Sequence, residues 1–253
     1  MKIRLHQFLS KTGEFASKSD VKQAIWNGKI TVNGSVVKDI AFQFNPSKKK
    51  VEYNGNEISL PITDFYFLLN KPKGHICSRI NSHERELEKI SVYELFREKV
   101  DAKVFESLIT VGRLDEDTTG FLLVTTDGKL VHSITEPKKN IKKTYRVETE
   151  SAISEQDIRS IRQGMEVSVV EFGVSELFST RPAQIELEHD KCAILTIDEG
   201  KKRQIRRMFK SLDNHVTELH RLSTEKMILS EYNLKPGEFC QVSRSEINVA
   251  LFS

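Results

Sequence analysis

An acidic turn that leads directly into an apolar run is the feature that most constrains this 253-residue chain. Residues 111–128 read VGRLDEDTTGFLLVTTDG. Gly112 permits an unusual backbone conformation, and the Thr-Thr-Gly sequence at 118–120 is typical of a turn. The apolar residues at 121–124 have to enter a core, so we expect a strand there and Asp115 at the mouth of its sheet. On this segment alone, a solvent-exposed acidic turn stays open as the alternative.

Positive charge is concentrated in the N-terminal quarter of the chain. Residues 1–60 hold ten Lys and Arg against five Asp and Glu, a balance of +5, although the whole chain, with 39 against 36, carries only +3. The remaining 29 basic and 31 acidic residues therefore give −2. This asymmetry indicates a polyanionic partner, of which nucleic acid fits best.

The same stretch, residues 1–60, predicts a small separate domain. Apolar residues at helical spacing end at Gly13, a second helix opens at Ser17 or Ser19, and an Asn-Gly pair at 33–34 predicts a β-hairpin. Two small helices followed by a basic hairpin suit docking on RNA. Many small basic domains dock on protein instead, and that alternative stays open.

Residues 4–37 resemble the S4 RNA-binding module, with its R-L-x-x-F-L start and its G-x-I-x-V-N-G-x-x-V end. The resemblance implies that the second helix and the loop after it face RNA. Three lysines would then lie near phosphates: Lys18, Lys22 and Lys29. For each of them a solvated helix face is the alternative.

The rest of the chain predicts a short linker at 61–64 and a larger domain at 65–253. A buried strand ending in a Lys-Pro-x-Gly turn opens this domain. Strands and helices then follow without regular βαβ repetition, which indicates an α+β fold with a mixed, mainly antiparallel sheet flanked by helices. We expect strands at 107–111, 120–125, 143–147 and 193–197, and helices around 91–100, 130–134, 154–164 and 203–212.

A single tyrosine lies among cations in a second segment, PKKNIKKTYRVE. Strand alternation sends Tyr145 and Val147 to one face and Arg146 to the other. Such a tyrosine can offer a stacking surface to an unpaired base, while cations such as Lys143 hold the flanking phosphates. A core tyrosine on a strand with basic flanks is the alternative.

Six of the ten residues 201–210 are basic in a third segment, DEGKKRQIRRMFKSLDNHV. An apolar stripe at helical spacing begins at Ile205, and Arg206 adjoins it. We therefore expect Arg206 to point partly inward and to pair with a carboxylate. Arg203, at the predicted helix start, is a candidate substrate contact. A basic helix that simply contacts RNA is the alternative.

A carboxylate, an aromatic surface and a cation suit the breaking and remaking of a glycosidic bond, because a carboxylate can meet the positive charge that develops at the sugar. Hydrolysis of the RNA backbone fits less well, since neither a His pair nor a two-metal carboxylate cluster is evident. Three isolated cysteines and scattered histidines indicate no metal site. The sequence offers no membrane span and no signal peptide, so we expect a cytoplasmic protein without a membrane partner.

Four segments together resemble those of pseudouridine synthases, in that family's order: NKPKGHICS, GRLDEDTTGFLLVTTDG, KKTYRVE and EGKKRQIRRMF. The resemblance implies that the N1–C1′ bond of a uridine breaks, the uracil turns within the pocket, and C5 bonds to C1′. It implies neither a metal nor a cofactor. The first of the four segments is interpreted as mainly structural.

The resemblance also implies residue roles. Asp115 matches the essential aspartate, Tyr145 the tyrosine that stacks on the target uracil, and Arg206 the basic residue paired with the aspartate. Such a pair would lower the pKa of Asp115 and keep it ionised at neutral pH. Arg113 matches an arginine that fills the space left by the flipped base, and Ile205 an aliphatic wall of the pocket.

An S4 module joined to EGxxRQIRRM is typical of the branch that modifies ribosomal RNA, and TRPAQIELE and NHVTELHR resemble the small-subunit (16S) enzymes. HRLSTEKMILS lacks a glycine frequent in the branch, and Lys202 replaces a frequent asparagine, so large-subunit (23S) RNA stays open as the substrate. The expected partner is ribosomal RNA, naked or within a partly assembled subunit, and the protein is expected to be a monomer. A non-catalytic RNA-binding assembly factor and a metal-dependent ribonuclease are the alternatives from other classes.

Overall fold

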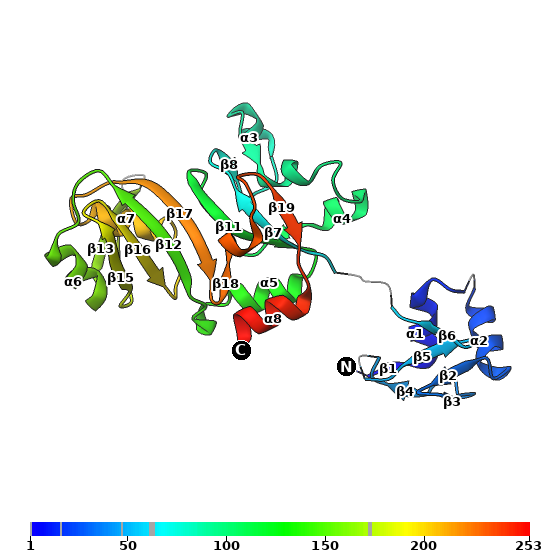
Figure 1. The fold of residues 1–253 in the computed structure, drawn as a ribbon. Coiled ribbons are helices and arrows are strands. Elements are labelled where there is room, and N and C mark those ends of the chain that lie inside the picture. The colour runs from blue at the N-terminus through cyan, green and yellow to red at the C-terminus, as the bar shows by residue number, and fades with distance from the viewer. Residues whose placement is uncertain (1, 16, 47, 61–63, 172–173) are drawn as a thin grey trace. The chain divides into compact units, whose positions relative to one another are not determined.

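The computed structural model describes residues 2–15, 17–46, 48–60, 64–171 and 174–253. The chain divides into two compact units, Met1–Thr63 and Asp64–Ser253 (Figure 1). Three residues of the expected linker, 61–63, lie outside the described residues, and Asp64 belongs to the second unit.

The first unit packs two helices on a small antiparallel sheet. Helix α1 (Leu5–Thr12) ends at Gly13 in the left-handed conformation, and α2 (Lys18–Trp26) begins after Ser17, whose hydroxyl accepts the Asp20 amide. Of the two predicted helix starts, Ser17 is therefore the one used. The sheet has the order β3-β2-β5-β6, with β1 and β4 paired separately. The strands are β1 (Ile3–Arg4), β2 (Ile30–Val32), β3 (Ser35–Val36), β4 (Gln43–Phe44), β5 (Val51–Tyr53) and β6 (Asn56–Ile58).

The second unit is built on one large sheet of order β15-β16-β12-β17-β11-β7-β19. Strands β11 and β17 pair in parallel, and the other neighbours in this order are antiparallel, which agrees with the expected mixed, mainly antiparallel sheet. Short strands β10 and β18 pair with β11 and β17. The bounds are β7 (Tyr66–Lys71), β10 (Ile109–Thr110), β11 (Thr118–Thr125), β12 (Lys143–Thr149), β15 (Gln184–His189), β16 (Cys192–Ile197), β17 (Val216–Thr224), β18 (Met227–Ile228) and β19 (Phe239–Gln241).

Both faces of this sheet are covered, which explains the continuous apolar run of β11. Leu122 and Val124 enter one core together with α6 (Glu155–Gln163) and α7 (Gln204–Lys210). The alternate residues Phe121 and Leu123 enter a second core with α5 (Gly128–Thr135) and α8 (Arg244–Phe252). A strand buried on both faces has no reason to alternate polar and apolar residues, so its sequence reads as uniformly apolar.

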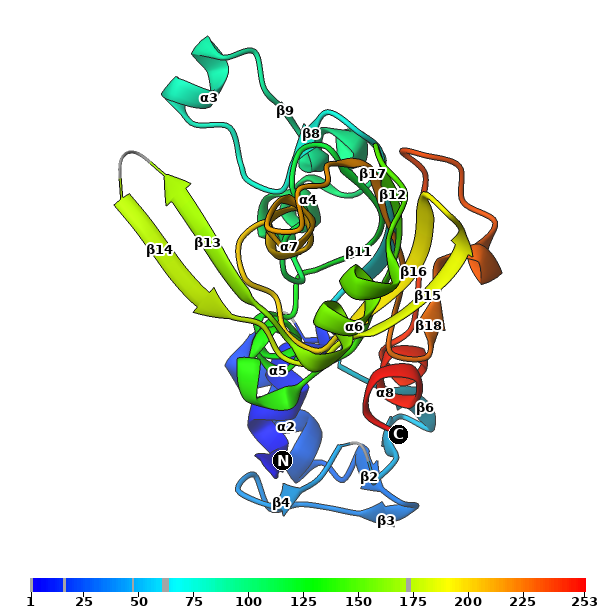
Figure 2. The same cartoon turned by 90° about the vertical axis from the view of Figure 1, so that its left-hand side faces the viewer.

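Several elements differ from the expectation. The helix expected at 91–100 is a 3₁₀ turn, η1 (Val92–Phe96). The strand expected at 107–111 shrinks to β10, because Ser107 is the last residue of α4 (Ala102–Ser107). The hairpin β13 (Glu166–Glu171) and β14 (Val174–Ser179), which extends away from the large sheet in Figure 2, was not predicted. The remaining elements are β8 (His75–Ile76), β9 (Ile90–Ser91), α3 (Ser82–Glu86), η2 (Pro137–Lys139) and η3 (Leu229–Tyr232).

Gly120 marks the closest approach within the sheet. It has a φ of +100° and pairs with Arg221 of β17, and a Cβ atom there would lie 2.3 Å from the Arg221 carbonyl oxygen. Gly120→Ala is therefore expected to lower the free energy of unfolding by roughly 2–4 kcal/mol through overpacking and backbone strain. Chemical denaturation would measure the change. Gly128→Ala is the matched control: its Cβ would meet only Ile109, at 3.9 Å. Equal losses in the two variants would contradict this account.

Candidate active site

The acidic turn is attached to the sheet by backbone hydrogen bonds. The Val111 amide donates to the Leu123 carbonyl at 2.8 Å, and Gly112 then turns the chain with a φ of +73°. Further on, the Thr118 amide donates to the Asp115 carbonyl at 3.1 Å. Asp115 therefore lies directly before β11, at the mouth of the sheet, where the sequence placed it.

A buried lysine at the end of β7 fixes the backbone of this turn. The Lys71 ammonium, fully buried, donates to the carbonyl oxygens of Pro72, Glu116 and Thr118 at 3.1, 3.2 and 2.7 Å. The Gly74 amide also donates to the Glu116 carbonyl, at 2.9 Å. Burial lowers the pKa of Lys71. These contacts give the Lys-Pro-x-Gly segment a structural role, in line with its interpretation.

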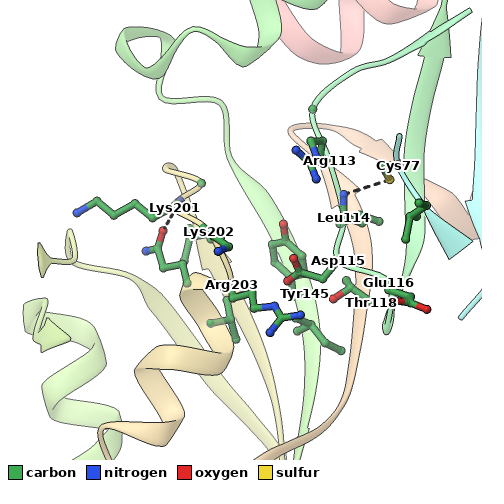
Figure 3. Close-up of a pocket in the computed structure, with 17 residues that line it drawn as sticks. Cys77, Arg113, Leu114, Asp115, Glu116, Thr118, Tyr145, Lys201, Lys202 and Arg203 are labelled. Carbon is green, nitrogen blue, oxygen red and sulfur yellow. Dashed lines mark hydrogen bonds between the residues drawn. The ribbon is translucent and has the colours of Figure 1, made fainter. Parts of the chain in front are cut away.

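Asp115 opens into a cavity of about 600 Å³. Five of the predicted site residues line it: Arg113, Asp115, Tyr145, Arg203 and Ile205. Figure 3 shows the Asp115 carboxylate next to the Tyr145 ring, with Arg203 extending towards both.

The Asp115 carboxylate lacks a contact ion pair with any cation of the described chain. Its pKa is raised, chiefly by burial. The positive charge of Arg203 acts against this rise, Asp117 adds to it, and Arg206 and Arg113 oppose it more weakly. The predicted direction of the Asp115 pKa shift was therefore wrong, because desolvation outweighs the nearby guanidinium groups.

Arg206 pairs with the other aspartate of the turn. Its Nη2 lies 3.0 Å from Asp117 Oδ2, and its Nη1 donates to the Val216 carbonyl at 2.9 Å. It is not among the residues that line the Asp115 cavity. The expected pair between Arg206 and Asp115 is thus replaced by one that ties α7 to the turn. Glu116, the middle carboxylate, pairs with Lys89 at 2.7 Å.

Tyr145 and Ile205 contribute the flat and apolar surfaces of the cavity. Tyr145 lies on β12 between Leu195 of β16 and Arg221 of β17, and it is only 8% exposed. Ile205, in the first turn of α7, is 4% exposed. Both side chains are held by their secondary structure, so the surfaces that they present to a ligand are fixed in place.

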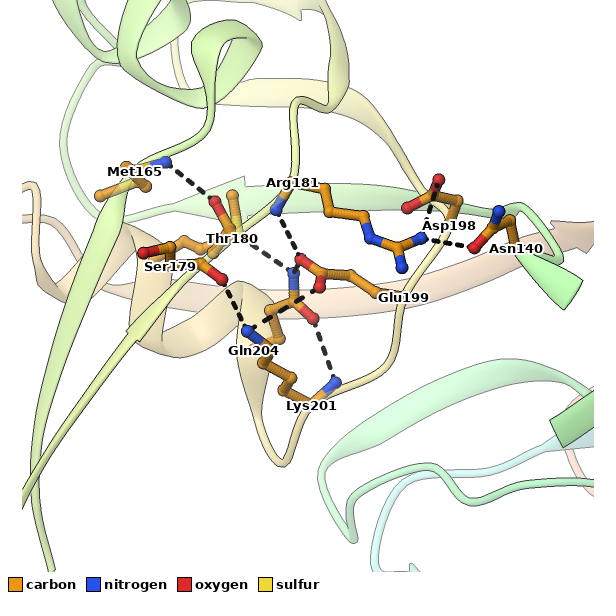
Figure 4. A network of polar contacts seen from close by, with 10 residues as sticks. Asn140, Met165, Ser179, Thr180, Arg181, Asp198, Glu199, Lys201 and Gln204 are labelled. Carbon is orange, nitrogen blue, oxygen red and sulfur yellow. Dashed lines mark hydrogen bonds and ion pairs between the residues drawn. The ribbon is translucent and has the colours of Figure 1, made fainter. Parts of the chain in front are cut away.

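A polar network that the sequence reading missed fixes the loop before α7 (Figure 4). The Gln204 side chain, 4% exposed, donates to Glu199 Oε1 at 2.6 Å and accepts the Lys201 amide at 3.1 Å. Glu199 Oε1 also accepts the Arg181 amide at 2.9 Å. The network holds Arg203 at the helix start with a φ of +51°. The sequence feature that could have revealed this network is Gln204, a glutamine among basic residues shortly after Glu199-Gly200.

The remaining candidate residues do not share this cavity. Lys143 lines a neighbouring cavity of about 430 Å³, and its ammonium donates to the Ile141 carbonyl at 2.8 Å. In the first unit, Lys18 and Lys22 line a separate cavity of about 740 Å³, and Lys29 is not among its lining residues. Within the described ranges, His, Cys, Asp and Glu form no group of three or more that could hold a metal ion. None of the described helices is long and apolar enough to cross a membrane.

Comparison with known proteins identifies the family. The family model for RNA pseudouridylate synthase matches residues 65–211, and the S4 domain model matches residues 3–55. The chain belongs to the RNA pseudouridylate synthase family. It is therefore a pseudouridine synthase that carries an S4 domain and acts on RNA.

Two curated relatives and one solved structure match nearly the whole chain. Ribosomal small subunit pseudouridine synthase A of Salmonella typhimurium is 34% identical over 97% of this chain and 98% of its own length. The protein of the same name from Escherichia coli K12 is 33% identical with the same coverage. A crystal structure of a pseudouridylate synthase is 31% identical, covers 97% of this chain and 98% of its own, and has a TM-score of 0.61.

The uncompensated burial of Asp115 has a consequence for stability. Because the pKa of Asp115 is raised in the folded protein, ionising it is harder in the folded than in the unfolded chain. Above the folded pKa, Asp115→Asn is therefore expected to raise the melting temperature. Below the ordinary aspartate pKa, about 3.9, the wild-type carboxyl is neutral in both states and the difference should vanish. Thermal unfolding across this pH range measures the effect.

Asp117→Asn is the matched control for this measurement. It weakens the ion pair with Arg206, so the melting temperature is expected to stay the same or fall at neutral pH. A fall for Asp115→Asn at neutral pH would contradict the electrostatic account of the site.

Proposed function

We propose that the chain converts one specific uridine of small-subunit (16S) ribosomal RNA to pseudouridine, and that Asp115 is the essential catalytic residue. The observation that carries the proposal is one cavity in which Asp115, Tyr145 and Arg113 meet beside the apolar Ile205. The substrate class is supported by the two curated relatives, both named as small-subunit enzymes and matched over 97% of this chain.

The target nucleotide reaches the cavity by leaving its stack. Asp115 lies at the mouth of a sheet, and a base held inside a helix could not bring its sugar against this carboxylate. Unpairing a base costs a few kcal/mol, so a uridine in a loop or bulge enters the cavity at a lower free-energy cost than a paired one. Stacking on Tyr145 returns roughly 1–3 kcal/mol of that cost. Arg113 occupies the space that the base leaves.

The reaction balances within the nucleotide. The N1–C1′ bond breaks, the uracil turns against Tyr145 and Ile205, and C5 bonds to C1′ with loss of the C5 proton, while N1 gains a proton. Attack of Asp115 on C1′ and abstraction of the 2′ proton by Asp115 both need an ionised carboxylate. Arg203 is the cation that most favours the ionised form. Arg206 acts as a positioning residue, through Asp117.

The S4 unit contributes to RNA binding. Lys18 and Lys22 line its cavity together with Lys2, Lys11 and His6, so four lysines converge on one surface. Such a cluster suits contacts to phosphates, which add affinity without reading sequence. Lys29 follows α2 and is proposed to contact phosphate outside that cavity.

Asp115→Asn is expected to abolish turnover and to retain RNA binding, because the amide keeps the shape of the carboxylate without its charge. Tritium release from RNA labelled at C5 of uridine measures turnover, with small- and large-subunit ribosomal RNA tested separately. Asp213→Asn, an exposed aspartate with a φ of +54° that asparagine tolerates, is the matched control and should keep wild-type turnover.

Each of the other possible results of this assay would indicate a different function or substrate. Release from large-subunit RNA alone would move the substrate and keep the chemistry. Turnover by Asp115→Asn would remove the catalytic assignment. Wild-type protein that binds ribosomal RNA without any release would indicate an assembly factor, and RNA cleavage lost on adding a chelator would indicate a metal-dependent ribonuclease.

The stacking role of Tyr145 predicts a difference between two substitutions. In the Asp115→Asn background, where turnover is absent, Tyr145→Phe should bind substrate RNA like its parent. Tyr145→Ala should bind about 5- to 150-fold more weakly, which corresponds to the loss of 1–3 kcal/mol of stacking. Dissociation constants from filter binding measure this. With the target uridine replaced by an abasic site the two variants should become equal, and equal binding on intact RNA would refute the role.

A further inference from the structure

A second cavity adjoins the first along the wall that contains Arg113 and Tyr145. It measures about 430 Å³, and it shares Gly112, Arg113, Tyr145, Gly200 and Lys201 with the Asp115 cavity. A nucleotide next to a uridine held at Asp115 would therefore lie close to the second cavity. The residues of this cavity have no part in the reaction described above apart from that shared wall.

Asp198 lines the second cavity with a carboxylate that has few partners. Asp198 Oδ1 is buried and lacks a hydrogen-bond partner among the described residues, although Oδ2 receives Arg181 Nη1 at 3.4 Å (Figure 4). Oδ1 itself is shielded, but the Asp198 side chain is 32% exposed and Oδ2 has only the 3.4 Å contact with Arg181, so the carboxylate can accept an N–H group of a ligand there.

The same cavity is also lined by two cations, Arg221 and Lys143. Arg221, 4% exposed, uses Nε to donate to the Phe121 carbonyl at 2.6 Å. Its four terminal N–H groups make no further hydrogen bond within the part of the chain that the structure describes. Lys143 lies close enough that Arg221 adds to the effect of burial in lowering the pKa of Lys143 to about 8. The carboxylates of Asp198 and Glu199 act on Lys143 in the opposite direction, so the cavity offers donors and acceptors together and favours a ligand that carries both.

Apolar side chains also line the cavity, among them Phe121, Leu123 and Ile141. A flat apolar ring with acceptors on one edge and donors on another would match the cavity on every side. Unpaired guanine has this pattern, with O6 and N7 as adjacent acceptors and N1–H and N2–H₂ as adjacent donors. Uracil has one ring donor between two acceptors, and adenine has no carbonyl oxygen for the cations.

We propose that the second cavity binds the base of a guanosine that directly neighbours the target uridine, with Asp198 accepting from N1–H and N2–H₂ and with Arg221 and Lys143 donating to O6 and N7. This proposal rests on the proposed function, since it needs an RNA whose uridine enters the Asp115 cavity. The enzyme then binds two unstacked bases: the target uracil, which reacts, and the neighbouring guanine, which determines substrate selection.

The test replaces guanosine by inosine, which lacks only the N2 amino group, next to the mapped target uridine in the ribosomal RNA that the wild-type protein modifies. Tritium release gives kcat/KM for each RNA. With wild-type protein, inosine at one of the two flanking positions should lower kcat/KM about 10- to 100-fold, the loss expected for a hydrogen bond to a charged acceptor. With Asp198→Ala, guanosine and inosine should give equal values. Asp190→Ala, an exposed aspartate at the β15–β16 turn, is the matched control and should keep the wild-type ratio.

Three results would overturn the proposal. They are the absence of guanosine from both flanking positions, a wild-type ratio of guanosine to inosine within twofold at both, and an Asp198→Ala variant that keeps the wild-type preference for guanosine over inosine. The first two need only wild-type protein, so they hold even if Asp198→Ala fails to fold. A wild-type protein that releases no tritium from any ribosomal RNA would instead refute the proposed function, and the second-cavity proposal with it.

Discussion

The contact on which the site depends is between a buried ammonium group and three backbone carbonyls. Lys71 occupies the end of β7, where a carboxylate partner would be the ordinary way to satisfy its charge, and it uses the carbonyls of Pro72, Glu116 and Thr118 instead. Because carbonyl groups satisfy its protons, the lysine fixes the acidic turn without taking up any of its three carboxylates. The turn is thus held by its backbone, and its three carboxylates are left for contacts with other groups.

The three carboxylates of the turn then divide between structure and chemistry. Glu116 pairs with Lys89 and Asp117 with Arg206, and both pairs attach the turn to neighbouring segments. Asp115 is left without a contact pair and is partly desolvated. An ion pair at contact distance would favour the ionised form, but it would also place a guanidinium where the proposed reaction needs the sugar. Arg203, acting at longer range from an exposed position, favours ionisation without that obstruction.

The sequence predicted the parts of this arrangement that depend on periodicity and turn chemistry. The apolar run at 121–124, the apolar face of α7 and the place of Asp115 before β11 follow from local patterns, and these were found as expected. The partner of Arg206 could not be predicted in this way. Asp115 and Asp117 are two residues apart on one turn, and only the path of the folded chain decides which one an arginine on α7 reaches. The hairpin β13–β14 could not be predicted for a related reason. Its first strand begins close after the predicted helix at 154–164, and among the described residues it pairs only with its own second strand and not with the large sheet.

The two adjoining cavities suggest how one chemistry serves different RNA targets. In the proposed function, the Asp115 cavity is walled by groups that touch the reacting nucleotide, so a change in Asp115, Tyr145 or Ile205 would alter the reaction itself. The second cavity shares only its boundary with that site, and Asp198, Lys143 and Arg221 contribute to it without lining the first. Substitutions among these three can therefore change which neighbouring base is accepted while the geometry around Asp115 is retained. The residues proposed to select the neighbouring base are thus separate from those proposed to carry the reaction, with Arg113 and Tyr145 at the boundary. Base selection could therefore change between related enzymes while the catalytic turn stays the same.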